Sequence, residues 1–178
     1  MQNGSIRLRA MEPEDLELLY HIENDYEIWG VGITNVPYSR YVLKEFVAAQ
    51  TGDIFTDKQV RLMVEDMSGE VVGIVDLVNF DPAHRRAELG VLIRKAYRRK
   101  GYAMDAVKAV CRYAKEIVHL HQIYIVIATD NRPAIELFQK VGFKKTAELT
   151  DWLCDGSAYH PAILMQYIIT QPSDFIYA

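Results

Sequence analysis

The chain has 178 residues, half of them hydrophobic and a quarter charged, and its formal net charge is -4. This composition fits one globular domain with a sizeable core and excludes a disordered or fibrous chain. The negative charge offers no field for nucleic acid or an anionic membrane, and no apolar stretch approaches the ~20 residues needed to span a bilayer, so we expect a cytoplasmic protein without a nucleic-acid or membrane partner.

The first half of the chain predicts a short strand, two helices and then three strands. Residues 6–9 alternate between apolar and charged side chains, as in a strand. A helix is expected to open at Pro13, because proline suits a first helical turn and the flanking carboxylates favour the positive end of the helix dipole. Ser39 is expected to cap a second helix after a loop. The β-rich runs cover residues 60–65, 71–78 and 87–93, with a hairpin turn at residues 67–70.

The second half alternates helices and strands. Apolar side chains recur at helical spacing over residues 101–118, and a shorter helical run over residues 133–141 is closed by Gly142. The unbroken apolar run 123–128 predicts a strand covered on both faces. The last two strands are expected near residues 144–152 and 159–168.

This order of elements predicts a mixed α/β (α+β) domain built around one sheet. We expect that domain to cover residues 1–170 and residues 171–178 to form a flexible tail. Cys111 and Cys154 lack metal-ligand spacing and are predicted to be free, buried thiols. His119 and His121 have no further ligands nearby, so no metal site is predicted.

A basic turn joins the strand ending at Ile93 to the long helix. Backbone N–H groups at a helix start are unpaired and, with the helix dipole, favour a phosphate or pyrophosphate. Gly101 lets the backbone approach such a ligand closely. The turn lacks the Gly-Lys-Ser/Thr of a Walker A loop and the three glycines of a dinucleotide fingerprint. A capped, basic helix start without a ligand is the alternative.

Gly90 lies inside a strand pattern, which predicts a bulge or a close approach of another backbone, and a packing accommodation is the alternative. A bulge would free the backbone groups of residues 91–93 for an extended ligand that carries amides. A phosphate at the helix start and amide pairing along the adjoining strand together describe coenzyme A.

Two segments resemble the cofactor-binding signatures of the GNAT superfamily of N-acetyltransferases. Residues 98–103, Arg-Arg-Lys-Gly-Tyr-Ala, match the signature Arg/Gln-x-x-Gly-x-Gly/Ala, and residues 131–138 followed by Val141-Gly142-Phe143 resemble the second element. The segments Arg7-Leu8-Arg9, His84-Arg85-Arg86-Ala87-Glu88 and Asp155-Gly156 resemble the bacterial spermidine N-acetyltransferase subgroup.

The resemblance implies a strongly twisted mixed sheet of about seven strands flanked by about four helices. The sheet would splay open between the strand ending at Ile93 and the strand near residues 123–128 to hold acetyl-CoA, and a homo-oligomer is suggested. The implied cofactor contacts are Val91, Leu92, Ile93, Arg98, Arg99, Lys100, Gly101, Tyr102, Ala103, Met104, Asn131, Ala134 and Phe138.

The sequence departs from the spermidine enzymes at two places. Phe138 stands where those enzymes carry a tyrosine that is thought to protonate the departing thiolate, so water, Tyr124 or Tyr97 would have to replace it. The loop over residues 29–38 has no acidic residue, whereas those enzymes have an acidic cluster there, which argues against spermidine. Trp29, Tyr38 and Trp152 are candidates to line an amine pocket.

We therefore expect an enzyme that transfers an acetyl group from acetyl-CoA to a primary amine of a small molecule by direct attack. Glu88 is the candidate general base, and a structural or substrate-anchoring carboxylate is the alternative. A backbone N–H near Val91 is expected to polarise the thioester carbonyl. Two other functions stay open: acetylation of a protein N-terminus or lysine, and acyl-CoA binding by a non-catalytic regulatory protein.

Overall fold

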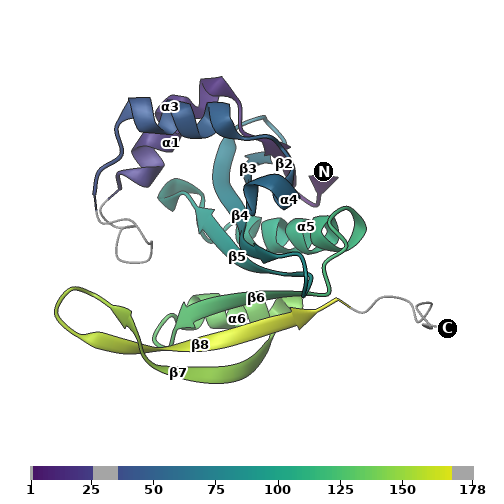
Figure 1. Ribbon diagram of the computed structural model, residues 1–178, viewed down its shortest axis with the longest axis vertical. Helices are drawn as coiled ribbons and strands as arrows, with labels where there is room; N and C mark the ends of the chain where they lie inside the picture. Colours follow the sequence, from purple (N-terminus) through teal and green to yellow (C-terminus); the bar gives the residue numbers. More distant parts are fainter. Residues whose placement is uncertain (1, 26–35, 170–178) are drawn as a thin grey trace.

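The computed structural model describes residues 2–25 and 36–169. One mixed sheet runs through this part of the chain, in the strand order β1-β2-β3-β4-β5-β6-β8-β7 (Figure 1). The strands are β1 (Gln2–Asn3), β2 (Ile6–Ala10), β3 (Val60–Asp66), β4 (Val71–Asp81), β5 (Arg86–Ile93), β6 (Gln122–Ala128), β7 (Lys144–Cys154) and β8 (Tyr159–Ile168). Neighbouring strands are antiparallel except for β5 and β6, which are parallel. The predicted mixed sheet is confirmed, and the two-residue β1 extends it beyond seven strands.

The helices of the described residues are α1 (Leu16–Glu23), α3 (Arg40–Ala49), α4 (Ile54–Asp57), α5 (Tyr102–Glu116) and α6 (Arg132–Val141), with 3-10 turns at Pro13–Asp15 and Lys95–Tyr97. Ser39 caps α3 as predicted, since its hydroxyl accepts a hydrogen bond from the Val42 N–H at 3.2 Å. The sequence analysis missed α4, a single turn capped by Asp53. Four residues are too few to show a helical period.

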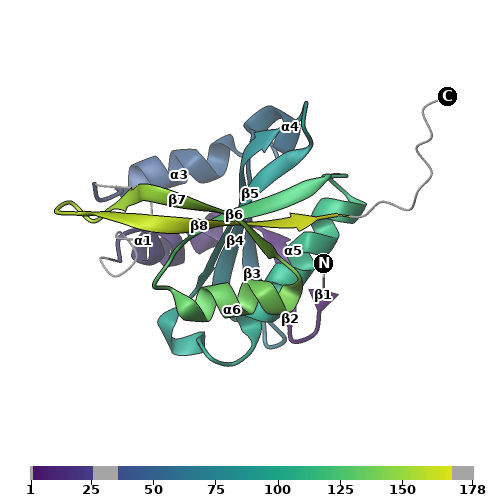
Figure 2. The ribbon, with the colours of Figure 1, turned by 90° about the horizontal axis from the view of Figure 1, so that it is seen from below.

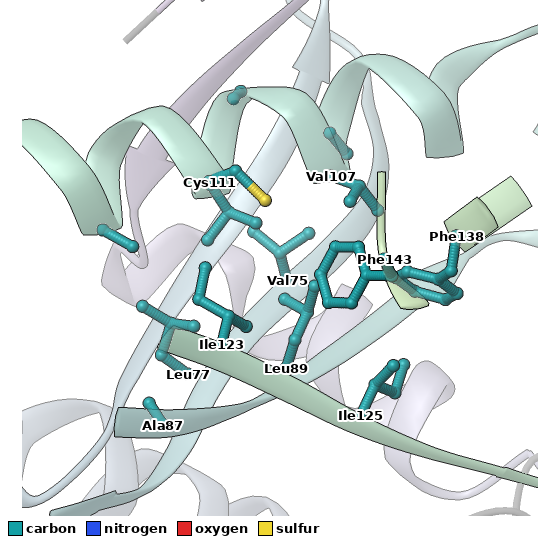
Figure 3. Packing of buried hydrophobic residues seen from close by; sticks show 14 of the residues in the cluster. Val75, Leu77, Ala87, Leu89, Val107, Cys111, Ile123, Ile125, Phe138 and Phe143 are labelled. Carbon is teal, nitrogen blue, oxygen red and sulfur yellow. The ribbon is translucent and has the colours of Figure 1, made fainter. Parts of the chain in front are cut away.

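The two faces of the sheet carry separate apolar clusters. On one face, α5 and α6 pack against the central strands, and Figure 3 shows Val107 and Cys111 of α5 over Val75 and Leu89. On the other face, α1 and α3 contribute Leu19, Ile22 and Leu43, which meet Met63 and Ile74 of the sheet. Figures 1 and 2 show α1 and α3 together, away from α5 and α6. Because both faces are covered, central strands such as β4 are apolar almost throughout.

The strands β7 and β8 extend beyond the rest of the sheet. The pairing of β6 with β8 ends at Ala128 and Ala162, whereas β7 and β8 remain paired as far as Cys154 and Tyr159. This two-stranded arm projects from the body in both views (Figures 1 and 2). Trp152 lies on it with 58% of its surface exposed.

The prediction of two buried thiols is wrong for one of them. Cys111 is buried, and burial raises the pKa of its thiol to about 12. Cys154 is exposed, because it lies near the end of the projecting arm, where no helix covers the strands. Across residues 2–25 and 36–169, no helix combines the length and apolar character required to cross a membrane.

Candidate functional site

The parallel strands β5 and β6 are joined over three residue pairs only and then diverge. The pairs are Arg86 with Gln122, Ala87 with Ile123, and Glu88 with Tyr124. Beyond this point β5 continues along β4, and β6 continues along β8. Residues 89–93 and 125–128 therefore face each other without backbone pairing between the two strands. Such unpaired edges present backbone N–H and C=O groups that an amide-bearing ligand can pair with.

The basic turn after β5 is held in shape by its own side chains. Arg94 forms an ion pair with Glu70 at 2.7 Å, and the Tyr97 hydroxyl donates to the same carboxylate at 3.0 Å. Arg98 Nε donates to the carbonyl oxygen of Ile93 at 3.0 Å. Arg99 and Lys100 follow and are exposed to solvent. The turn thus places two exposed cationic side chains directly before α5.

The start of α5 has the geometry of an anion site. Gly101 is the N-cap with φ of 87°, which favours glycine, and no side chain caps the helix. The N–H groups of Tyr102, Ala103 and Met104 therefore point out of the helix end without a side-chain acceptor. A Cβ atom at Gly101 would meet nothing within 4 Å, so space is open beside the backbone. A diphosphate fits these donors and the helix dipole.

Of the alternatives expected for Gly90, the bulge is not formed. The β4–β5 register is continuous from Gly73–Ile93 to Val78–Glu88 and passes through the pair Asp76–Gly90. The glycine instead allows a close approach, because a Cβ atom there would lie 3.3 Å from Cβ of Asp76. The free edge of residues 91–93 results from the divergence of the strands, which makes a bulge at Gly90 unnecessary.

The bulge lies on the other strand, at Asn79. The register shifts between Val78 and Asp81, so that Asn79 and Phe80 together oppose Ala87. Asn79 has φ of 50°, and its side-chain amide donates to Oε2 of Glu88 at 2.8 Å. Sequence reasoning missed this contact. Asparagine tolerates positive φ better than most residues, but that tendency alone does not mark a site.

The structure separates the two tyrosines that were left as alternatives. Tyr97 lies on the basic turn and is engaged by Glu70. Tyr124 lies opposite Glu88 at the last pair before the strands diverge. Burial raises the pKa of Tyr124, and the charge and hydrogen bonding of Glu88 raise it further, whereas Arg86 opposes the shift. Tyr124 thus stays protonated at neutral pH beside the candidate base.

Phe138 is 4% exposed, and its ring packs edge-on against Phe143 with ring centroids 5.1 Å apart, near Ile125 in Figure 3. It supplies no proton donor. Asn131 caps α6, since its side-chain oxygen accepts a hydrogen bond from the Ala134 N–H at 3.3 Å. The start of α6 follows the end of β6 directly, so Asn131 and Ala134 lie at the end of the sheet where β5 and β6 have separated.

Two further carboxylates lie on the side of the sheet that carries Glu88, Asp76 on β4 and Glu23 at the end of α1. Asp76 and Glu23 both bind Arg61, Asp76 through two contacts of 2.7 and 3.0 Å. Tyr38 packs into the cluster between α1 and α3. Trp29 and most of the acid-free loop lie outside the described residues. Among the residues described, no three His, Cys, Asp or Glu side chains are grouped to hold a metal ion.

The family model for the acetyltransferase (GNAT) domain matches residues 5–144. The spermidine N(1)-acetyltransferase of Escherichia coli (strain K12) is 29% identical over 165 residues, which cover 90% of this chain and 84% of that protein. A crystal structure of the spermidine N-acetyltransferase from Vibrio cholerae in complex with CoA and spermine has a TM-score of 0.81 and 27% identity, covering 93% of this chain and 96% of the other. A dodecameric structure of the Vibrio cholerae enzyme has a TM-score of 0.79 and 26% identity, covering 93% of this chain and 95% of the other.

Proposed function

Since the chain belongs to the GNAT acetyltransferase family and is an N-acetyltransferase that uses acetyl-CoA, we propose that its acceptor is a primary amine of a small molecule. The observation that carries the proposed binding of acetyl-CoA is the divergence of β5 and β6 beside the uncapped start of α5, and the spermidine N-acetyltransferases among the relatives support a small amine as acceptor. A chain of amides fits along the free edges of the strands, and a diphosphate fits the helix start.

The proposed contacts of the cofactor fall into three groups. Val91, Leu92 and Ile93 provide the free edge of β5. Arg98, Arg99 and Lys100 supply positive charge, and Gly101, Tyr102, Ala103 and Met104 supply helix-start N–H groups. Asn131, Ala134 and Phe138 lie on α6 across from them. Acetyl-CoA, when bound, supplies an activated acetyl group.

Glu88 is the proposed general base. A bond forms between the amine nitrogen and the acetyl carbon, the C–S bond breaks, and the nitrogen loses a proton that Glu88 accepts directly or through water. An N–H near Val91 polarises the carbonyl. Tyr124, protonated and next to Glu88, is the candidate proton donor to the leaving thiolate. An ordinary thiol has a pKa near ~8.5, so its thiolate leaves without a strong acid.

The acceptor is proposed to carry a positive charge when it is free in solution. The three carboxylates of Glu88, Asp76 and Glu23 lie on this side of the sheet. The guanidinium group of Arg61 binds Asp76 and Glu23, and the excess negative charge suits an ammonium group. The relatives from Escherichia coli and Vibrio cholerae are spermidine N-acetyltransferases, which supports a small amine. A polyamine is one candidate. Because residues 29–38 contain no acidic side chain, other small amines are candidates as well.

The acceptor is tested by measuring thiol release from acetyl-CoA with polyamines, amino acids and peptides bearing a free N-terminus or lysine. We expect turnover with at least one small primary amine and none with the peptides. Turnover with peptides alone would assign the chain to protein acetylation. Binding of acetyl-CoA without thiol release on every acceptor would assign it to acyl-CoA sensing.

The base is tested with Glu88→Gln. We expect kcat to fall by ~10²–10⁴ and the acidic limb of its pH profile to disappear, while acetyl-CoA binding measured by calorimetry is unchanged. An unchanged profile would dismiss Glu88 as the base and leave a structural or anchoring role.

A homo-oligomer is also proposed. The related Vibrio cholerae enzyme is dodecameric, and the match covers 93% of this chain. Light scattering of the purified protein measures its mass directly, and a monomeric mass would reject this proposal.

A further inference from the structure

The bulge in β4 places a side-chain amide where a regular strand would not. Two residues of β4, Asn79 and Phe80, oppose the single residue Ala87 of β5. The Phe80 N–H donates to the carbonyl oxygen of Lys58 at 3.2 Å, and its ring is buried, so the bulge is anchored from the side of β3. Asn79 is left at φ of 50° and is exposed. A residue other than glycine therefore adopts the left-handed backbone conformation at this position.

The amide of Asn79 reaches Glu88, the residue at the last β5–β6 pair. Its Nδ2 donates to Oε2 at 2.8 Å, which is good hydrogen-bond geometry. From β6, Tyr124 lies beside the same carboxylate. The nearby charged groups on β4 and β5, Asp81 and Arg86, bind each other at 3.2 Å. Two neutral donors, one from each adjoining strand, thus surround the candidate base.

We propose that Asn79 is a positioning residue for acetyl transfer: the bulge of β4 directs its amide onto Oε2 of Glu88 and fixes the orientation of that carboxylate. This inference rests on the proposed role of Glu88 as the base. A hydrogen bond to Oε2 restricts rotation of the carboxylate and so defines where its other oxygen, Oε1, lies. Misplacement of a catalytic group by about 1 Å can cost ~10²-fold in rate, so a loss of this restraint has a measurable effect.

Asn79 also has a purely structural explanation, because asparagine is enriched at positive φ. Two substitutions separate these roles. Asn79→Gly preserves the left-handed backbone and removes the amide. Asn79→Asp preserves shape and tolerance of positive φ but replaces the donor with a second carboxylate facing Glu88.

Both substitutions are made in the full chain and again together with Glu88→Gln. For Asn79→Gly we expect kcat to fall about tenfold, with the KM for acetyl-CoA and the melting temperature nearly unchanged. For Asn79→Asp we expect the acidic limb of the kcat profile to move to higher pH by about one unit, because a like charge disfavours ionisation of the base. In the Glu88→Gln background both substitutions should change kcat less than about twofold, since the group they act through is gone.

A readout that does not depend on turnover is the titration of Tyr124, followed by NMR in the protein without acetyl-CoA. If Asn79 orients Glu88, Asn79→Gly shifts the Tyr124 titration, because the charge that raises the pKa of Tyr124 moves. If Asn79 served only to adopt positive φ, Asn79→Gly would keep that backbone and leave this titration, kcat and the pH profile unchanged.

Three results would overturn the inference, and they differ in meaning. A full tenfold loss from Asn79→Gly in the Glu88→Gln background would show that Asn79 acts independently of Glu88, and the base would stand. If both Asn79 substitutions left kcat and its pH profile unchanged while Glu88→Gln lowered kcat, the positioning role of Asn79 would be rejected and Glu88 would remain the base. If Glu88→Gln itself had no effect on kcat or its pH profile, both the role of Glu88 as base and the positioning role of Asn79 would be rejected.

Discussion

Glu65 and Glu88 are carboxylates on the same sheet with opposite surroundings. Glu65 on β3 is 5% exposed and is bound by the guanidinium groups of Arg7 and Arg9, while Arg9 also holds Asp15 with two contacts of 2.6 and 2.7 Å. Glu88 on β5 is half-buried and lies between the neutral side chains of Asn79 and Tyr124. Charged partners stabilise a carboxylate so strongly that it stops being a useful base.

The pKa values of Glu65 and Asp15 show how arginine partners stabilise the ionised form of a carboxylate. Burial opposes the ionisation of Glu65, but hydrogen bonds from Arg9 and Arg7 outweigh it and hold the pKa of Glu65 below its ordinary value. Burial likewise opposes the ionisation of Asp15, and the hydrogen bonds from Arg9 and the Glu12 N–H outweigh it. The comparison teaches that the partners of a carboxylate, more than its burial, separate a structural role from a catalytic one.

The largest expected effect is on stability, from Glu65→Gln. The substitution removes the charge that Arg7 and Arg9 share. Arg9 keeps Asp15 and the Arg7 side chain is 59% exposed, so the cost is that of lost charge-assisted hydrogen bonds, about 2 kcal/mol. For a chain of this size the melting temperature should fall by about 4–8 °C. Calorimetry measures the fall, and kcat at 20 °C should stay within about twofold. A large loss of kcat in a protein that remains folded would show that Glu65 is not a purely structural carboxylate.

The second expected effect is a loss of stability in acid. The pKa values of Asp15 and Glu65 are lowered in the folded state, so their contribution is present above the unfolded values near ~4 and is lost as the pH falls through the lowered ones. The free energy of unfolding of the native chain should therefore decline below about pH 4. In Asp15→Asn the decline should be shallower. Equal slopes in the two proteins would show that Asp15 is not the linked group.

A third effect concerns Tyr124. The charge of Glu88 contributes to the raised pKa of this tyrosine, so Glu88→Gln should lower that pKa toward the ordinary value near ~10 while burial keeps part of the shift. NMR of labelled tyrosine follows the titration. Tyr97, whose pKa is raised chiefly by its hydrogen bond to Glu70, is the internal control and should not move.

The smallest expected effect comes from Phe138→Tyr. The substitution introduces the tyrosine that the family resemblance implies for this position. Turnover should be preserved or raised by up to a few-fold, since the thiolate leaves without a strong acid. Steady-state kinetics with Phe138→Leu as the matched control measure the change. A collapse of turnover with an unchanged melting temperature would show that the ring at position 138 has a steric role in the site.

The sequence predicted the features that depend on local pattern. The strands, the long helix after Gly101 and the cap at Ser39 follow from periodicity and capping chemistry, and the structure places them within a few residues of the expected ends. The divergence of β5 and β6 came from family resemblance, because no local pattern states where two strands stop pairing. The last pair before the divergence, Glu88 with Tyr124, joins two strands that are far apart in the sequence.

The missed features depend on tertiary contacts. A bulge was one of the alternatives expected for Gly90, yet the bulge occurs at Asn79, and its contact with Glu88 depends on the register of the two paired strands. Gly73 was not singled out, although a Cβ atom there would lie 2.3 Å from the carbonyl oxygen of Leu92. Such close approaches between strands are visible only when both strands are in place.

The three rungs that join β5 to β6 have a mechanical consequence. They are the sole ladder between the two halves of the described sheet, and α5 and α6 cover both halves on one side. Glu88 and Tyr124 form the last of these pairs. A rotation of one half of the sheet against the other would therefore change the distance between the proposed base and the proposed acid.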